Sequence, residues 1–250
     1  METDIGFTTD KGRVREKNED SLCVVKSALS NSGKEVLLLA VADGMGGHRA
    51  GDVASRFVTD AVDKFVSELK SENSEECLLG LLGEKMADIN RDLGHFANQN
   101  PEYEGMGTTL TAGIFIEKKM FLMHIGDSRC YMLRNRNLQR LSVDHSWVAQ
   151  QVLAGEMNEE EAFSHRYRNI LTQCLNGGPI EPLFLSESLI QDDVFLFSSD
   201  GLHGLIMDKD ISVLLQKKSS SQEICDLLIH EALNHGGGDN ITAIVYKLNG

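Results

Sequence analysis

The sequence predicts an α+β fold in which antiparallel sheets are layered with helices. Strand-like runs follow one another in hairpin-like succession near the start of the chain and again over residues 108–142. Helical sequence is grouped apart from these runs, over residues 53–96 and after the strand that ends at Phe197. The strict alternation of strand and helix found in a doubly wound parallel fold is missing.

Strands are expected first over residues 4–8, 21–27 and 35–42, and the last two are joined by the turn-like segment 30–33. Four more strands are expected over residues 108–117, 120–125, 128–133 and 138–142. Residues 144–178 differ, because they are polar, rich in charge and helical only in short pieces. The remaining strands are expected over residues 194–197 and 241–248.

Two amphipathic helices are expected between the two groups of strands. The first has apolar residues four apart on one face: Val53, Phe57, Ala61, Phe65 and Leu69. The second has them three and four apart: Leu78, Leu82, Met86, Ile89, Leu93 and Phe96. Asn73 can cap this second helix, with Glu76 at its third position. Two helices follow residue 197, and Ser220, Glu223 and Gly236 mark the capping box and the end of the later one.

Composition indicates a soluble globular protein. The 250 residues are 41% apolar and 25% charged, and only three are proline, so we expect a single domain over residues 1–250 with a sizeable core. The longest apolar run, Val36–Ala42, is far too short to span a membrane, and the acidic start at residues 1–4 lacks the features of a signal peptide. We therefore expect a cytoplasmic, monomeric protein without membrane contact.

Charge and cysteine content exclude further classes of protein. A formal net charge of -14 argues against nucleic-acid binding, because the phosphate backbone would be repelled. Five scattered cysteines without a C-x-x-C pair make a zinc site or a disulfide framework unexpected.

Four aspartates lie beside glycine or asparagine where a strand-like run ends or begins: Asp43-Gly44, Gly126-Asp127, Asp200-Gly201 and Asp239-Asn240. Any one of these pairs is on its own an ordinary turn. Helical sequence separates Asp200 from Asp239, however, so a simple hairpin does not explain that pair. Carboxylates at several strand ends can converge, and hard divalent cations bind oxygen ligands. The pattern therefore predicts a metal-centred active site.

Six motifs in a fixed order resemble the metal-dependent protein phosphatases of type 2C, in their bacterial form. They are Arg15–Asp20, Ala42–His48, Gly107–Thr109, Ile125–Arg129, Ser199–Leu202 and Gly238–Thr242. The resemblance runs over nearly the whole chain. It implies a four-layer α-β-β-α sandwich, with two antiparallel sheets flanked by helix pairs and two Mn²⁺ or Mg²⁺ ions in a cleft at the sheet edges.

The resemblance also implies roles for the carboxylates. Asp43 is similar to the aspartate that bridges both ions, and Gly44 to the glycine whose carbonyl binds one of them. Asp200 and Asp239 are similar to ligands of the other ion. Asp127, together with Asp200, matches the place where bacterial members bind a third, weaker ion, although its alternative role is to fix a turn.

Three residues of the first motif complete the implied site. Glu19 and Asp20 would hold metal-bound waters. Arg15 is similar to the residue that grips the substrate phosphate, and its planar guanidinium suits two phosphate oxygens at once. Without the neighbouring Asn18-Glu19-Asp20, Arg15 would be read as a surface arginine in a charged loop.

The resemblance implies hydrolysis of phosphoserine and phosphothreonine in proteins by in-line attack of a hydroxide that bridges the two cations. The implied partners are phosphorylated proteins and an opposing Ser/Thr kinase. Met45 stands where eukaryotic relatives carry a histidine, so the acid that protonates the leaving group stays open. His48 and His165 are candidates for that acid, with a structural or surface role as the alternative.

Residues 144–178 correspond to the mobile flap beside the cleft of bacterial members. Loops over a site commonly set substrate access. The segment holds Trp147, His165, Arg166 and Arg168, which are suited either to meet a phosphopeptide or to pack the flap itself.

Rival readings are weaker. Cys130 and Arg136 have the C-x5-R spacing of cysteine-dependent phosphatases, but the residues between them include no glycine and read as a strand. A pseudo-enzyme or binding module on this fold would usually lack some metal carboxylates, and Asp43, Asp200 and Asp239 are all present. Neither of the glycine-rich nucleotide-binding patterns, G-x-G-x-x-G and G-x-x-x-x-G-K-[ST], occurs.

Overall fold

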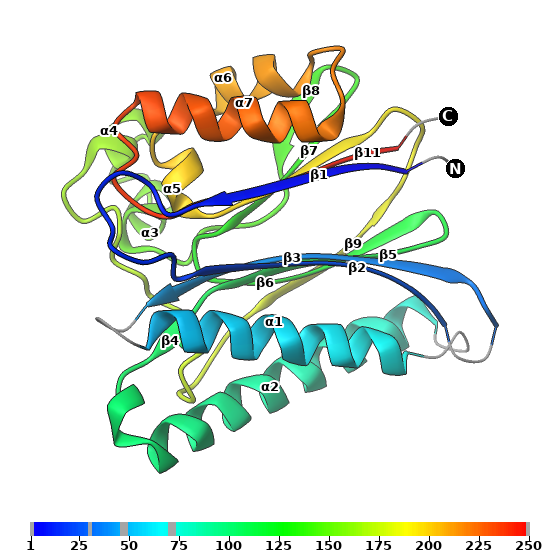
Figure 1. Ribbon diagram of the computed structural model, residues 1–250, viewed down its shortest axis with the longest axis vertical. Helices are drawn as coiled ribbons and strands as arrows, with labels where there is room; N and C mark the ends of the chain where they lie inside the picture. Colours follow the sequence, from blue (N-terminus) through cyan, green and yellow to red (C-terminus); the bar gives the residue numbers. More distant parts are fainter. Residues whose placement is uncertain (1–2, 30–31, 46–49, 70–73, 249–250) are drawn as a thin grey trace.

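Two antiparallel sheets lie face to face, and helices cover the outer face of each, in a computed structural model that describes residues 3–29, 32–45, 50–69 and 74–248 (Figure 1). The layers follow the order α-β-β-α, which confirms the predicted fold class. Both chain ends lie at the same end of the sandwich, opposite α3 and α4.

The first sheet has five strands in the order β1 (Thr3–Asp10), β11 (Ile241–Leu248), β10 (Val194–Ser198), β7 (Arg129–Arg134) and β8 (Asn137–Arg140). Strand β11 lies between β1 and β10, and its Ile244 is opposite Phe7 of β1 on one side and Phe197 of β10 on the other. The first described strand of the chain is thus paired with the last one. Because β10 and β11 are antiparallel, the segment that follows β10 and the segment that precedes β11 lie at the same end of the sheet.

The second sheet has the order β2 (Asp20–Ala28), β3 (Glu35–Met45), β5 (Leu110–Ile116), β6 (Lys119–Ile125) and β9 (Leu183–Ser188), with β4 (Gly107–Thr108) paired to the end of β3. Strand β9 was not among the predicted strands. It lies at the edge of the sheet and is only half-buried, and its sequence LFLSES carries three polar residues in a run of six. A strand at an edge needs less continuous apolar sequence than a central one, so its signal is weak.

Helices α1 (Gly51–Glu68) and α2 (Glu75–Gln99) cover the second sheet, and α5 (Asp200–His203), α6 (Asp208–Leu215) and α7 (Ser221–Asn234) cover the first. A 3-10 turn, η1 (Pro101–Tyr103), follows α2. Helices α3 (Trp147–Leu153) and α4 (Glu159–Ser164) belong to the segment 144–178 and lie beside α5 at one end of the sandwich (Figure 1). Within the described ranges, no helix is long and apolar enough to cross a lipid bilayer.

The buried face of α1 is shifted by one residue from the predicted row. The fully buried residues that face the sheet are Ala54, Val58, Val62 and Val66. The predicted row lies along the border of this stripe: Val53, Phe57 and Ala61 are only partly buried, whereas its last two members, Phe65 and Leu69, are buried. A helix that packs on a sheet buries an arc wider than one row, so a row of every fourth residue marks the right face and misplaces its centre.

The N-terminal cap of α7 agrees with the prediction, and that of α2 differs from it. At α7, the Ser220 side chain accepts from the amide of Glu223 and the Glu223 carboxylate accepts from that of Ser220, as predicted. At α2 the N-cap is Ser74, whose hydroxyl accepts from the Cys77 amide at 3.2 Å. The prediction for Asn73 was therefore wrong by one residue, and Asn73 itself lies outside the described residues.

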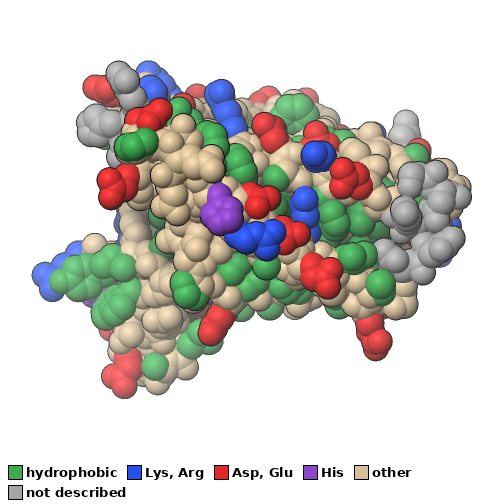
Figure 2. Space-filling model, turned by 90° about the horizontal axis from the view of Figure 1, so that it is seen from below, with side chains coloured by type: hydrophobic (Ala, Val, Ile, Leu, Met, Phe, Trp, Pro, Cys, Tyr) green, Lys and Arg blue, Asp and Glu red, His purple; other side chains and the backbone are tan. Residues whose placement is uncertain are grey.

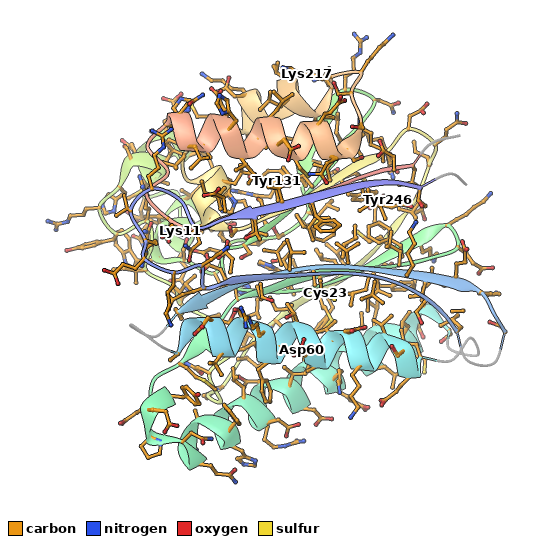
Figure 3. The ribbon with its side chains drawn as sticks, viewed as in Figure 1. Lys11, Cys23, Asp60, Tyr131, Lys217 and Tyr246 are labelled. Carbon is orange, nitrogen blue, oxygen red and sulfur yellow. The ribbon has the colours of Figure 1, made fainter. Side chains whose placement is uncertain are left out.

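The core between the sheets is built around an aromatic group in which the Phe115 ring meets the rings of Phe195 and Tyr246 edge-on, with centroids 5.2 Å and 4.9 Å apart. Tyr246 is labelled between the two sheets in Figure 3. Separate apolar cores lie between each sheet and its helices. The outer helical face viewed in Figure 2 mixes acidic, basic and hydrophobic side chains, as a solvent-facing surface does.

Candidate active site

Asp43 lies near the end of β3, and two threonines hold its backbone. The Asp43 amide donates to Oγ1 of Thr109, while the Thr109 amide and the Thr108 hydroxyl both donate to the Asp43 carbonyl, each at 2.9 Å. These bonds fix the backbone that carries the Asp43 carboxyl group. They give the motif Gly107–Thr109 a physical role that the sequence did not specify.

Gly44 is required by close packing of the backbone. A Cβ at this position would lie 2.1 Å from the carbonyl oxygen of Gly51 and 2.6 Å from that of Glu19. The start of α1 and the residue before β2 therefore lie directly against Gly44, and no side chain fits there. Ser55 of α1 reinforces this contact, because its hydroxyl donates to the Glu19 carbonyl at 2.6 Å.

Asp20 joins the two sheets. It lies opposite Asp43 in the ladder between β2 and β3, and its Oδ2 accepts from the hydroxyls of Ser199 at 2.7 Å and Thr242 at 2.6 Å, which belong to the first sheet. Its other oxygen, Oδ1, is buried and has no hydrogen-bond partner among the described residues. Burial raises the pKa of Asp20 to about 7.

Asp200 and Asp239 are brought together by backbone contact. A Cβ on Gly201 would lie 2.0 Å from the carbonyl oxygen of Asn240, so the turn after β10 touches the turn before β11. Burial, and then repulsion from Asp239, raise the pKa of Asp200 to about 6. The carboxyls of Asp200 and Asp43 lie within hydrogen-bonding reach of each other, and Oδ1 of Asp200 is a second buried oxygen without a partner among the described residues.

Arg15 points at this cluster. Its Nη2 donates to Oδ2 of Asp239 at 2.8 Å, and this bond, helped by the charges of Asp200 and Asp43, raises the Arg15 pKa. The side chain is still 51% exposed, so the guanidinium is accessible to a ligand. Arg15 thus lies at the surface and is paired with an aspartate of the cluster.

Asn240 organises the loop that carries Arg15 and was not singled out from the sequence. Its Oδ1 accepts from the Glu19 amide at 2.8 Å, and its Nδ2 donates to the carbonyls of Lys11 at 3.0 Å and Lys17 at 2.8 Å. Lys11 is labelled on this loop, just after β1, in Figure 3. The only sequence signal was its place beside Asp239 in the last motif.

Asp127 belongs to the same group of carboxylates. It is 8% exposed, and burial together with repulsion from Asp200 raises its pKa well above the usual range. Burial, together with repulsion from Asp20, Asp200 and Asp127, also raises the pKa of Asp43. The structure thus brings together the predicted aspartates from strand ends of both sheets, with Glu19 and Gly44 beside them.

The donor set fits hard divalent cations. Five aspartates are crowded into a partly buried site, where bound positive charge would offset their mutual repulsion. Two of these aspartates, Asp20 and Asp200, have a buried oxygen without a hydrogen-bond partner among the described residues. Asp20 and Asp239 each use an oxygen for another partner, Ser199 and Arg15 respectively. Accordingly, no three Asp, Glu, His or Cys side chains of the described ranges already form a closed ligand set. The residues supply the charge and the oxygens that such ions need.

Segment 144–178 borders the cluster on one side. Arg168 lines the same cavity as Arg15, and its charge lowers the pKa of Asp200, so this arginine faces the carboxylates. Trp147 stacks on His165 with ring centroids 5.2 Å apart, and Tyr167 meets both rings edge-on. Arg166 lies over the Tyr167 ring, 4.5 Å from its centroid.

Of the four predicted residues in this segment, Arg168 lines the cavity and also donates to the Phe163 carbonyl of its own segment, at 3.3 Å. Trp147, His165 and Arg166 take part in packing the segment itself. His48, the other candidate acid, lies outside the described residues. Met45 ends β3 opposite Gly107.

The cysteine-dependent alternative is excluded by position. Cys130 is fully buried within β7, and burial raises its thiol pKa, so the reactive thiolate is disfavoured. Arg136 lies in the turn between β7 and β8. No phosphate-binding loop joins the two residues, because β7 runs through the interval.

The fold, with carboxylates gathered at the ends of two packed sheets, is typical of a class of metal-dependent hydrolases. Comparison with known proteins specifies the class further. The family model of protein phosphatase 2C matches residues 13–232. The chain belongs to the protein phosphatase 2C family.

Relatives and solved structures agree. The serine/threonine phosphatase stp of Listeria welshimeri is 35% identical over 248 residues, which cover 97% of this chain and 95% of that protein. The serine/threonine protein phosphatase PstP of Mycobacterium tuberculosis is 37% identical over 95% of this chain and 43% of its own length. The structure of Stp1 from Staphylococcus aureus matches with a TM-score of 0.90 at 34% identity, covering 100% of this chain and 96% of that one. The PstP catalytic domain in complex with two manganese ions matches with a TM-score of 0.85 at 33% identity, covering 99% of each chain.

Proposed function

We propose that the cluster of Asp43, Asp200, Asp239 and the carbonyl of Gly44 holds two divalent cations. Arg15 binds the substrate phosphate on the solvent side of these cations. The observation that carries this proposal is the meeting of unpartnered, buried carboxylate oxygens from both sheets beside an exposed guanidinium. As a member of its family, the chain is a metal-dependent serine/threonine protein phosphatase.

The chain's own residues position the reactants. Asp43 and Asp200 face each other across the junction of the sheets, and the threonine bonds to Asp43 limit how far its carboxyl group can move. Asp20, fixed by two hydroxyls, presents its free Oδ1 to the same space, where we expect it and Glu19 to hold water. When bound, the cations would activate water and supply positive charge for phosphoryl transfer.

Arg15 and Arg168 both line the cavity and would provide positive charge for the substrate. A phosphate that binds Arg15 would compete with the Asp239 carboxylate for the same guanidinium. Asp127 lies close enough to Asp200 to help hold a third cation. Two manganese or magnesium ions, and a third at Asp127, are the composition we propose.

The wider setting is proposed on the same basis. Residues 1–250 would form one catalytic domain with 144–178 as its flap. The substrates would be phosphorylated proteins made by an opposing Ser/Thr kinase, and the protein would act as a monomer in the bacterial cytoplasm, in signalling.

The test combines turnover with ion binding. Hydrolysis of an aryl phosphate and of a phosphothreonine peptide is measured with Mn²⁺, with Mg²⁺, with chelator and after iodoacetamide treatment. Manganese binding is followed by calorimetry in the parent, in Asp43→Asn and in Asp60→Asn, an exposed aspartate of α1 that serves as the control. We expect metal-dependent, alkylation-resistant turnover, with ion binding and turnover lost only in Asp43→Asn. Chelator-resistant turnover that iodoacetamide abolishes would contradict the proposal.

A further inference from the structure

One cavity connects the carboxylate cluster with the space beneath segment 144–178 and has a volume of about 760 Å³. Its polar side is lined by Arg15, Asp127, Asp200 and Asp239. Cavities of roughly 300–1,000 Å³ hold ligands as large as a drug molecule, so a phosphorylated side chain at Arg15 fills only part of this one. The rest is available to neighbouring residues of the same substrate.

Away from the cluster, the lining includes a group of apolar side chains among charged ones. Val148 and Val152 lie one turn apart on the same face of α3, and Phe163 projects from α4. Leu205 and Met207, from the connection between α5 and α6, complete this group. Two short helices of segment 144–178 and the start of α6 therefore form one wall that offers methyl, thioether and ring surface.

Two ion pairs lie among the charged residues that line this part of the cavity. Nη2 of Arg140 lies 3.0 Å from the Glu159 carboxylate, and Nη2 of Arg129 lies 2.7 Å from the carboxylate of Asp144. The side chains of Arg129 and Asp144 are only 16% and 9% exposed, so a charged ligand would have to disrupt a largely desolvated pair. An apolar ligand group needs no such exchange.

Exposed apolar side chains extend the wall toward solvent. Val143 is 45% exposed and Leu153 is 75% exposed, and both line the cavity. Covering them would remove apolar surface from water, which is favourable. Because the cavity is continuous with the carboxylate cluster, a molecule whose phosphate lies at Arg15 is the one placed to cover this wall.

We propose that the wall formed by Val152, Phe163 and Met207 is a subsite for a hydrophobic side chain of the phosphoprotein substrate. Since an extended chain advances about 3.3 Å per residue, side chains up to three positions away lie within about 10 Å of the phosphorylated one. The subsite rests on the proposed phosphatase function and adds to it a preference among substrates. The preferred substrate segment carries phosphoserine or phosphothreonine together with a leucine-like neighbour.

The test uses pairs of phosphothreonine peptides that differ only by leucine or serine at one flanking position, scanned from three residues before to three after the phosphothreonine. With Mn²⁺ present, we expect the parent to favour leucine at one of these positions by on the order of tenfold in kcat/KM. An aryl phosphate, which is too small to reach the wall, reports on the catalytic centre alone.

Met207→Ser removes part of the wall without weakening α6. Met207 is the N-cap of α6 and makes no capping bond with its side chain, whereas serine at this position can accept from the first turn. We expect the preference for leucine to fall to about twofold in Met207→Ser and in Val152→Ser. Val213→Ser, on the same helix but 61% exposed and outside the cavity, is the matched control and should keep the parent's preference.

Three results would overturn the subsite. They are equal kcat/KM for both peptides of every pair in the parent, a preference that both wall variants retain, and a loss in those variants that is equal for the leucine and serine peptides. The last result would assign the residues to packing of segment 144–178. Absence of manganese-dependent hydrolysis of every substrate, the aryl phosphate included, would instead contradict the proposed function and the subsite with it.

Discussion

Gly94 of α2 lies in direct contact with Gly177, near the end of segment 144–178: a Cβ on Gly94 would lie 2.6 Å from the Cα of Gly177. Asn90, one turn earlier in α2, accepts from the Gly177 amide at 2.9 Å and donates to the Gly178 carbonyl at 2.7 Å. The segment that borders the cleft is therefore anchored at its end to the helix layer behind the second sheet.

Because of this contact, replacing glycine by alanine in α2 should change the free energy of unfolding in opposite directions at Gly94 and at Gly80. Gly94→Ala forces the two backbones apart and should lower the free energy of unfolding by about 1–3 kcal/mol. Gly80→Ala, where a Cβ would meet nothing within 4 Å, should raise it by about 0.5–1 kcal/mol, because alanine favours the helix. Urea unfolding of both variants checks this. A stabilised Gly94→Ala protein would show that the contact is not close in solution.

The parts of the fold that could be predicted are those with a local signal. The strand Ile241–Leu248 and the capping box of α7 were predicted as they occur, because hydrophobic pattern and capping chemistry are set by residues close in sequence. The half-buried edge strand β9 was missed, and the N-cap of α2 was misplaced by one residue, since several polar residues near position 74 can cap a helix.

The candidate site divides in the same way. The carboxylates were found because each ends a strand or follows a glycine. The contacts that place them were not found, because they join residues far apart in sequence: Asn240 holds the amide of Glu19 across 221 positions, and Thr242 holds Asp20 across 222. No spacing rule encodes such pairs.

Asp200→Asn should separate the stability of the metal-free protein from its activity. The Asp200 carboxylate is buried beside other carboxylates, so a neutral side chain of the same shape removes repulsion. In chelator at neutral pH we expect a higher melting temperature than the parent's, and with Mn²⁺ a fall in turnover of at least about 100-fold.

Thermal melts and turnover of Asp200→Asn are compared with those of Asp60→Asn, whose aspartate is exposed on α1 and should change neither quantity. A variant that melted below the parent in chelator would contradict the account of repulsion. Full turnover with an unchanged manganese titration would remove Asp200 from the proposed ligands.

Arg15→Ala should act mainly on substrate affinity. A charge-assisted contact to phosphate is made already when the substrate binds, so KM should rise more than kcat falls, with a combined loss of about 10- to 100-fold in kcat/KM. Arg13→Ala, in the same loop but outside the cavity, is the control. Steady-state kinetics with a phosphopeptide give KM and kcat for both variants and the parent. Unchanged KM and kcat in Arg15→Ala would return this arginine to a surface role.

Asp127→Ala should leave the fold and the two tighter ions in place while turnover slows substantially. A site with fewer carboxylates binds its cation more weakly, so the parent's rate should keep rising with Mn²⁺ after two ions have bound. Calorimetric titration beside a curve of rate against metal concentration measures both effects. If the variant kept the parent's rate, or lost tight binding and melted early, Asp127 would be a structural residue or a ligand of the first pair.

Because His124 is buried, we expect the protein to lose stability in mild acid. It is fully buried on β6, where its ring nitrogens pair with the Thr111 hydroxyl and the Val143 carbonyl, each at 2.9 Å. Burial, and then repulsion from His145, lower its pKa to about 4. The unfolded chain takes up this proton near pH 6.5. The stability that neutral His124 confers is therefore fully present above about pH 6.5 and is lost as the pH falls toward 4.

The expected loss from this one residue is about 2 kcal/mol at pH 5. Urea unfolding in chelator at pH 7.5 and pH 5 is compared for the parent and for His124→Gln, whose side chain is neutral at both. The carboxylate cluster titrates in both proteins, so its contribution cancels when the two pH-dependent changes are subtracted. The parent should lose about 2 kcal/mol more than the variant, whereas equal losses would mean that His124 can take up a proton without unfolding.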